Sequence, residues 1–102
     1  MRQGDIWLME QPFEDPRPVI VISRNWAISH LNKVVVAPIT RTLHSAQTVI
    51  SVGREQGLRY DSVATFDNLI SIPQSQLTHQ IGALSDGGRD QMCYALMSVA
   101  DC

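Results

Sequence analysis

Short apolar runs separated by polar turns make up most of the chain, a pattern typical of β-strands. The first run, Gly4–Glu10, alternates, so we expect a strand with Ile6 and Leu8 on one face and Trp7 and Met9 on the other. Further strands are expected at Arg17–Ser23 (buried on both faces), Lys33–Thr40, Gln47–Gly53, Ser62–Phe66 continued by Leu69–Ile72 as a fifth strand, and Gln80–Leu84.

The connections between these strands are short and rich in turn residues. Gln11–Pro16 and Arg54–Asp61 predict polar loops, and the mixed periodicity of Arg24–Asn32 predicts a loop with at most one helical turn. Asp67-Asn68 predicts a bulge within the fifth strand, and Pro73–Thr78 predicts a helical turn with proline at its first position. Gaps this short exclude the helical crossovers of a parallel sheet.

The apolar period changes near the end of the chain. After Ser85, a residue suited to capping a helix, Met92, Leu96 and Val99 recur at the spacing of one helical face. This spacing predicts a terminal amphipathic helix. Several short strands with a closing helix predict a mainly β fold, a small curved barrel or half-barrel with a C-terminal α-helix.

Composition and charge restrict the class of protein. A chain of 102 residues has the length of one domain, and its net charge of −2 argues against a broad basic face for duplex nucleic acid. A narrow groove for a single strand remains compatible with that charge. Since no apolar run approaches the roughly 20 residues of a membrane span and no secretory signal is visible, we expect a cytoplasmic protein without membrane contact.

Cysteine and histidine residues do not form a recognisable site. Cys93 and Cys102 would lie about 13 Å apart along a helix, too far for a disulfide, so we expect Cys102 to be a free thiol. His30, His44 and His79 are well separated and are expected on the surface or in loops. No metal-binding or nucleotide-binding motif occurs in the sequence.

Candidate chemistry concentrates at the ends of two predicted strands. Thr40 and Arg41 follow the apolar run of the third strand, and Arg17 stands between two prolines at the entry to the second. Each has a structural alternative. Arg17 could pair with Glu14 or Asp15, the Thr40 hydroxyl could bond to its own backbone, and Arg41 could simply be solvated.

Five blocks of sequence, in order, resemble the MazF/PemK toxins of bacterial toxin–antitoxin systems: MRxGDIW, RPVIVIS, VVVAPIT, GL…DSVATFDN and IGALS before the terminal helix. The resemblance covers residues 1–102 as one toxin domain. It implies a homodimer of SH3-like barrels of the CcdB/PemK type, each with a C-terminal helix. It further implies an endoribonuclease that is neutralised by a MazE-like antitoxin, whose flexible segment covers the RNA site.

Motif by motif, the resemblance implies that Arg17 and Thr40 are catalytic and that Asp67 contributes to RNA recognition. Asn68 is the expected second reader of base edges, and Arg41 is our own candidate for an additional RNA-binding charge. The implied reaction is cofactor-free and metal-independent: the 2′-hydroxyl of single-stranded RNA, in mRNA, tRNA or rRNA, attacks phosphorus. It leaves 2′,3′-cyclic phosphate and 5′-hydroxyl ends.

Two departures leave the recognised RNA sequence open. The loop Gln11–Pro16 is shorter than the glycine-rich loop that many family members carry, and the common DQxRT pattern appears here as Asp67-Asn68-Leu69-Ile70-Ser71. Three alternatives to the ribonuclease remain: a CcdB-like inhibitor of DNA gyrase, a silent paralogue and a peptide-binding module. The Arg17/Thr40 pair favours the ribonuclease. Trp26 could pack at the dimer interface or stack on a base.

Overall fold

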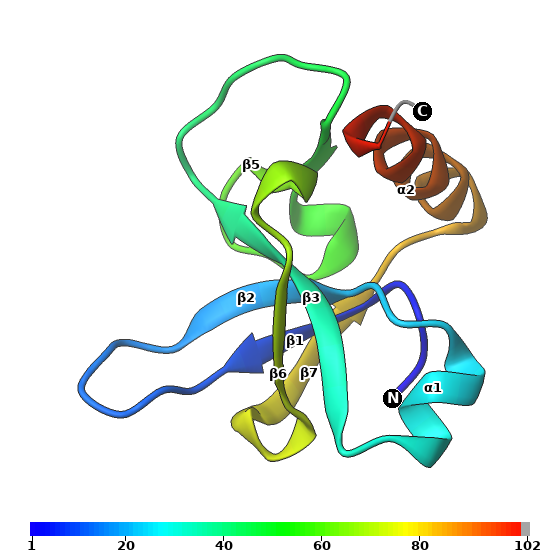
Figure 1. Cartoon of the computed structure of the whole chain (residues 1–102). Helices are drawn as coiled ribbons and strands as arrows, with labels where there is room; N and C mark the ends of the chain where they lie inside the picture. The colour runs from blue at the N-terminus through cyan, green and yellow to red at the C-terminus, as the bar shows by residue number, and fades with distance from the viewer. Residues whose placement is uncertain (101–102) are drawn as a thin grey trace.

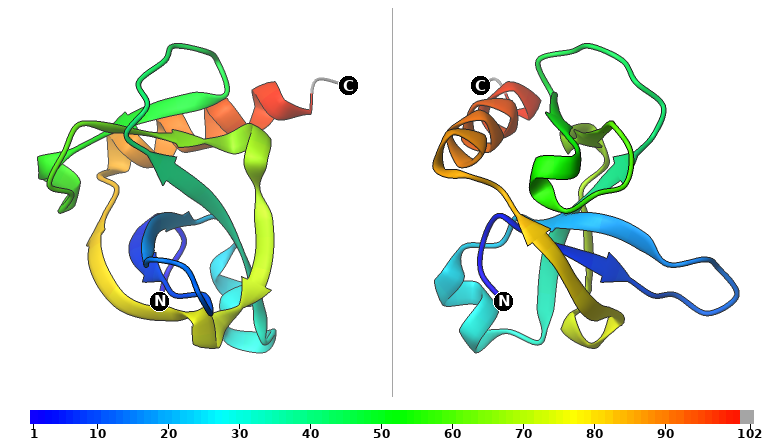
Figure 2. Two further views of the ribbon diagram at one scale, coloured as in Figure 1. Left: turned by 90° about the vertical axis from the view of Figure 1, so that its left-hand side faces the viewer. Right: turned by 180° about the vertical axis from the view of Figure 1, so that it is seen from behind.

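A strongly curled antiparallel sheet forms the body of the molecule, and α-helices flank it (Figure 1). The computed structural model describes residues 1–100. In chain order the elements are β1 (Asp5–Met9), β2 (Arg17–Val21), α1 (Asn25–His30), β3 (Lys33–Thr40), β4 (Val49–Val52), the 3-10 helix η1 (Arg54–Gln56), β5 (Ser62–Thr65), the 3-10 helix η2 (Phe66–Asn68), β6 (Ile70–Pro73), the 3-10 helix η3 (Gln74–Gln76), β7 (Leu77–Ala83) and α2 (Asp86–Val99). The sheet order is β4-β5-β3-β2-β1-β7, with β6 paired to β3 outside this path. Two further views show the curl of the sheet, and the predicted mainly β half-barrel with a C-terminal helix is confirmed (Figure 2).

The central strand is β3, because it pairs with three others. Its middle pairs with β2 through Ile20↔Ala37, its beginning with β6 through Lys33↔Pro73, and its end with β5 through Ile39↔Ala64. A strand with neighbours on both edges and apolar packing on both faces requires the β-branched run that the sequence carries there. The end of this strand, at Thr40, is therefore held by the surrounding sheet.

The predicted bulge in the fifth strand is wrong, because a helical turn divides the segment into two strands. Along β3, the step from Ile39 to Val36 covers three residues, while the paired step from Ala64 to Ile70 covers six. The three additional residues form η2. Phe66, the first of them, is fully buried, which anchors the turn to the core.

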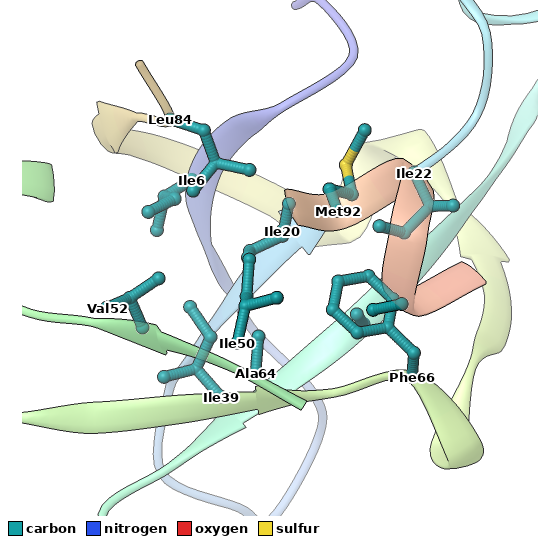
Figure 3. Close-up of a cluster of buried hydrophobic side chains, with 12 residues drawn as sticks. Ile6, Ile20, Ile22, Ile39, Ile50, Val52, Ala64, Phe66, Leu84 and Met92 are labelled. Atoms are coloured by element: carbon teal, nitrogen blue, oxygen red, sulfur yellow. The ribbon is translucent and has the colours of Figure 1, made fainter. Parts of the chain in front are cut away.

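Apolar side chains pack on both sides of the sheet. On one side, residues from β1, β2, β4, β5 and α2 point toward one another around Phe66 and Met92 (Figure 3). On the other side, Val19 and Val21 of β2 pack with Ile28 of α1. The second strand is thus buried on both faces, as its sequence predicts. Burial of a side chain such as Met92 contributes about 1.5–3 kcal/mol to stability.

Helix α1 is longer than the single helical turn expected within Arg24–Asn32. Ile28 provides its buried contact, and the Gln74 side-chain amide donates to the carbonyl oxygens of Ile28 (2.7 Å) and Leu31 (2.8 Å). Carbonyls at the end of a helix otherwise lack partners. The capping group comes from a distant part of the chain, so the local sequence does not predict it.

Helix α2 begins as predicted, since the Ser85 side chain accepts a hydrogen bond of 3.1 Å from the Gly88 N–H. Met92 is buried and Leu96 is partly buried against the core. Val99 is 39% exposed, so its expected place on the packed face is wrong. The last turn of α2 extends past the sheet (Figure 2). Cys93 is exposed, and the prediction for Cys102 lies outside the described residues.

Two boundaries near β7 also differ from expectation. Pro73 ends β6 rather than opening the helical turn, which comprises Gln74–Gln76. Strand β7 begins at Leu77, three residues before the expected start, because Leu77 pairs with Met9 of β1. Within residues 1–100, no helix is both long enough and apolar enough to cross a membrane.

Candidate active site

A cleft of about 1090 Å³ opens where β2 begins and β3 ends. Both strand ends lie on the left in Figure 1. Four of the five residues singled out in the sequence line the cleft: Arg17, Thr40, Arg41 and Asn68. Residues that lie far apart along the chain therefore meet at one surface. The cleft is the candidate active site.

The register of β2 and β3 explains how the first two of these residues come together. Val19 pairs with Pro38 in an antiparallel ladder. Arg17 lies two residues before this pair on β2, and Thr40 lies two residues after it on β3, so both leave the ladder at the same end. Both residues line the cleft. A guanidinium and a hydroxyl are thereby presented at the same end of the sheet.

Arg17 is exposed, and its predicted alternative role is not observed. The ion pair recorded among the described residues joins Arg89 to Asp86 at 3.5 Å, and neither Glu14 nor Asp15 pairs with Arg17. Pro16 and Pro18 line the cleft on either side of it. The guanidinium of Arg17 is therefore available to an anion in the cleft.

Thr40 forms the local bond that was its structural alternative. Its Oγ1 accepts a hydrogen bond of 3.2 Å from the backbone N–H of Thr42. A hydroxyl that accepts through a lone pair can still donate its own hydrogen. The bond therefore orients Thr40 and leaves it able to donate to a phosphate or sugar oxygen.

The cleft is strongly biased toward positive charge. Arg17, Arg41 and Arg59 line it, and no Asp or Glu does so among the residues that the structure describes. The whole chain nevertheless carries a net charge of −2. A concave surface with one sign of charge concentrates ligands of the opposite sign, and guanidinium groups bind phosphate oxygens through paired, charge-assisted hydrogen bonds.

The residues of the cleft that the sequence did not single out as site residues include His44, Arg59 and Tyr60. The Arg41 guanidinium lies 3.8 Å from the centre of the Tyr60 ring, a cation–π contact. His44 Nδ1 lies 3.4 Å from the carbonyl oxygen of Thr42. Arg41 and Tyr60 lie far apart in the sequence, and no local pattern predicts their contact.

Asp67 does not line the cleft, although its neighbour Asn68 does. Both belong to η2, and the Asp67 carboxylate accepts a hydrogen bond from the Thr48 hydroxyl. Trp26 is also absent from the cleft; it lies in α1, stacked on His30. In the described part of the chain, no group of three or more His, Cys, Asp or Glu side chains is arranged to hold a metal ion.

Comparison with known proteins connects this geometry to a family. Residues 2–100 match the family model described as a PemK-like, MazF-like toxin of a type II toxin–antitoxin system. The chain is 31% identical over 102 residues to the probable endoribonuclease MazF5 of Mycobacterium tuberculosis, covering 98% of this chain and 93% of that protein. It is also 41% identical over 68 residues to the endoribonuclease MazF3 of the same species, 67% of this chain and 66% of that protein.

Solved structures give the same result. The Mycobacterium tuberculosis toxin MazF-mt6 is similar with a TM-score of 0.87 and 32% identity, covering 95% of this chain and 96% of that one. A mycobacterial endoribonuclease in complex with its cognate antitoxin is similar with a TM-score of 0.87 over 97% of this chain and 93% of that chain. At 18% identity, the second likeness concerns the fold alone.

Proposed function

The chain belongs to the PemK/MazF family of toxins from type II toxin–antitoxin systems, and on this premise we propose that it cleaves single-stranded RNA in the cytoplasm at a specific sequence, using the cleft that holds Arg17 and Thr40. Endoribonuclease activity follows from the family. The observation that carries the rest is the arginine-lined cleft, free of carboxylates in residues 1–100, at the end of β3. Such a cleft suits a polyanion.

The proposed reaction is an internal transesterification. The bond from the ribose O2′ to phosphorus forms, and the bond from phosphorus to O5′ breaks. The proton lost by O2′ is matched by the one gained by O5′, so the step consumes neither water nor a co-reactant. Its products are a 2′,3′-cyclic phosphate and a 5′-hydroxyl. DNA lacks the attacking group and is not a substrate.

Arg17 is assigned to the developing negative charge on the phosphorane oxygens. Its two outer N–H groups can donate in parallel to those oxygens. A donor placed to stabilise charge in the transition state contributes about 3–4 kcal/mol, so its loss slows the reaction about 100- to 1,000-fold. Support comes from its place between two prolines at the start of β2, unpaired with Glu14 or Asp15.

Thr40 is assigned to orientation rather than to proton abstraction. A hydroxyl is not an effective base at neutral pH, but one fixed by the Thr42 N–H can donate to the scissile phosphate or to the attacking oxygen. Asn68 is assigned to reading a base, since its amide can both donate and accept and it lines the cleft. Asp67 would act from beside the cleft, and its bond to Thr48 would have to yield to a base.

Two partners belong to the proposal. The first is a cognate antitoxin, and the similar mycobacterial endoribonuclease was solved with its own antitoxin. An acidic or extended segment of the cognate antitoxin would occupy the arginine-lined cleft and exclude RNA. The second is another copy of this chain in a homodimer, as the family resemblance implies. Co-purification of a co-expressed antitoxin and the molar mass in solution test these two partners directly.

The deciding experiment is incubation of purified protein with long single-stranded RNA in excess EDTA, with the cut ends mapped. We expect discrete cuts ending in 2′,3′-cyclic phosphate, retained in EDTA and abolished by a single 2′-deoxy substitution at the cut site. Arg17→Gln should lose 100-fold or more, by the estimate for a lost donor of about 3–4 kcal/mol. Arg24→Gln, an exposed arginine beside α1, is the matched control and should cut normally.

Two results would contradict the proposal. Full activity in a folded Arg17→Gln protein would remove Arg17 from the mechanism. A protein that cuts no RNA across varied sequences would point to a toxin that acts by binding a protein target, and binding to DNA gyrase would be measured next.

A further inference from the structure

The contact between Arg41 and Tyr60 has a geometry that phosphate binding alone does not require. The guanidinium lies 3.8 Å from the centre of the Tyr60 ring, within the cleft that holds Arg17 and Thr40. A salt link to phosphate needs the N–H edge of an arginine, not a planar support beneath it. A Cζ this close above the ring centre suits parallel stacking, which would fix the plane of the guanidinium and leave its opposite face uncovered by Tyr60.

The sheet brings the two residues together at the mouth of the cleft. Thr40 pairs with Val63, so Arg41 follows the last paired residue of β3 and Tyr60 precedes the first residues of β5. The Ser62 hydroxyl donates to the Tyr60 carbonyl oxygen at 2.9 Å. Arg41 directly follows β3, and Tyr60 is separated from β5 by one residue, so both lie close to strand ends.

The loop that carries Tyr60 is also held from the other side. Gly57 has a φ of 95°, and a Cβ added there would overlap the carbonyl oxygen of Ile81 in β7. A Cβ on Gly82 would likewise overlap the carbonyl oxygen of Gln56. Backbone thus packs on backbone between η1 and β7. Leu58, the next residue, packs against the core. These contacts hold the loop that carries Tyr60 in place before any ligand binds.

The stacked pair is accessible and unneutralised. Tyr60 is 53% exposed, so part of its side chain remains available to a ligand. Arg41 is exposed and has no ion-pair partner within the described chain. Unpaired RNA bases are commonly held on aromatic rings and on arginine planes. A flat, cationic surface next to a phosphate site therefore matches a base that has turned out of the strand.

We propose that Arg41 and Tyr60 form a stacking subsite for one unpaired nucleobase that neighbours the scissile phosphate. The subsite rests on the proposed ribonuclease function and adds to it a recognition element, Tyr60, outside the motifs of the family. It contributes binding of the strand rather than stabilisation of the transition state. Its loss therefore raises KM and changes kcat little.

The test uses the intact protein and an RNA containing one mapped cut site, in which each position in turn is made abasic. We expect Tyr60→Leu to raise KM about 5- to 150-fold, the range for losing one base–aromatic stack, and Tyr60→Phe to restore it. Arg41→Lys keeps the charge but not the plane, and should lose binding of the same base. At one RNA position only, the abasic substitution and Tyr60→Leu together should raise KM by less than the product of their separate effects.

Tyr94→Leu is the control, because Tyr94 is 69% exposed on α2 and does not line the cleft. It should leave KM unchanged. Equal effects of the two tyrosine variants, or additive losses at every abasic position, would overturn the subsite. Matched thermal unfolding of Tyr60→Leu and the native protein separates a folding defect from a binding defect.

A second readout separates failure of the subsite from failure of the proposed function. An RNA that carries 2-aminopurine at single positions and cannot be cut reports stacking through quenched fluorescence, whether or not the protein cleaves. Quenching at one position, lost in Tyr60→Leu, supports the subsite. Cleavage of the mapped RNA without quenching in the 2-aminopurine RNA would refute the subsite but not the proposed ribonuclease function. Absence of cleavage together with quenching would refute the ribonuclease alone.

Discussion

The salt dependence of RNA binding gives a quantitative test of the arginine-lined cleft. Arg17, Arg41 and Arg59 line it, and no carboxylate does so within residues 1–100. If each guanidinium neutralises one phosphate, the logarithm of affinity falls with the logarithm of salt concentration with a slope of about −2.1, at about −0.7 per contact for a single strand. Between 50 and 200 mM salt, affinity should then fall about 18-fold.

Arg59→Gln is the informative perturbation, because Arg59 has no assigned role in the chemical step. With two contacts left, the slope should be about −1.4 and the fall over the same salt range about 7-fold. The assay is fluorescence anisotropy of a labelled RNA that contains the recognised sequence with one 2′-deoxy residue at the cut site. The RNA then binds without being cut.

Lys33→Gln is the matched control for charge. Lys33 is exposed at the first residue of β3, and the eight-residue strand separates it from Thr40 by roughly 23 Å. Removing this cation changes the net charge as Arg59→Gln does but leaves the cleft intact. The reasoning is refuted if Arg59→Gln keeps the native slope, or if Lys33→Gln reduces the slope equally.

Three further outcomes follow from the structure. Thr40→Val should slow cleavage at least 10-fold in single-turnover assays with mapped RNA, a loss of about 1.4 kcal/mol or more for one hydrogen bond to a charged group. Thr40→Ser should retain most activity. Equal rates for Thr40→Val and the native protein would exclude a role for the Thr40 hydroxyl in cleavage. Gly82→Ala should destabilise the protein by about 1–3 kcal/mol, because its Cβ would overlap the Gln56 carbonyl, whereas Gly87→Ala, with its nearest contact 4.0 Å away, should not lower the melting temperature. Met92→Ala, at a fully buried position, should cost about 2–5 kcal/mol in urea unfolding, and a smaller cost would show that the site collapses around the truncated side chain.

Much of the fold is encoded locally. The β-branched runs of β2 and β3 need burial on both faces, and the structure provides it with a core on each side of the sheet. The Ser85 cap and the spacing of Met92 and Leu96 define α2 in the same local way. Arg17 and Thr40 were found because each flanks an apolar run, Arg17 before the run of β2 and Thr40 at the end of β3, where polar side chains can remain exposed.

Other features depend on contacts between distant parts of the chain, which periodicity does not report. Strands β5 and β6 both pair with β3, and the segment that joins them is three residues longer than the stretch of β3 it spans. The turn η2 takes up these residues, and a bulge in its place would leave Phe66 without its buried site. Asp67 lies beside the cleft rather than in it, bonded to Thr48 nineteen residues away. Neither arrangement is visible in the local sequence.

The cleft also combines residues that the sequence predicts with residues that only the tertiary structure places there. Arg17 and Thr40 follow from strand boundaries in the sequence. Arg59 and Tyr60 join them only because glycines at positions 57 and 82 let the backbone of η1 pack against β7. The sequence by itself determined most of the strands, the terminal helix, the family and four of the residues in the cleft. The tertiary structure decided which loop completes the cleft, because that choice rests on contacts between segments far apart in the chain.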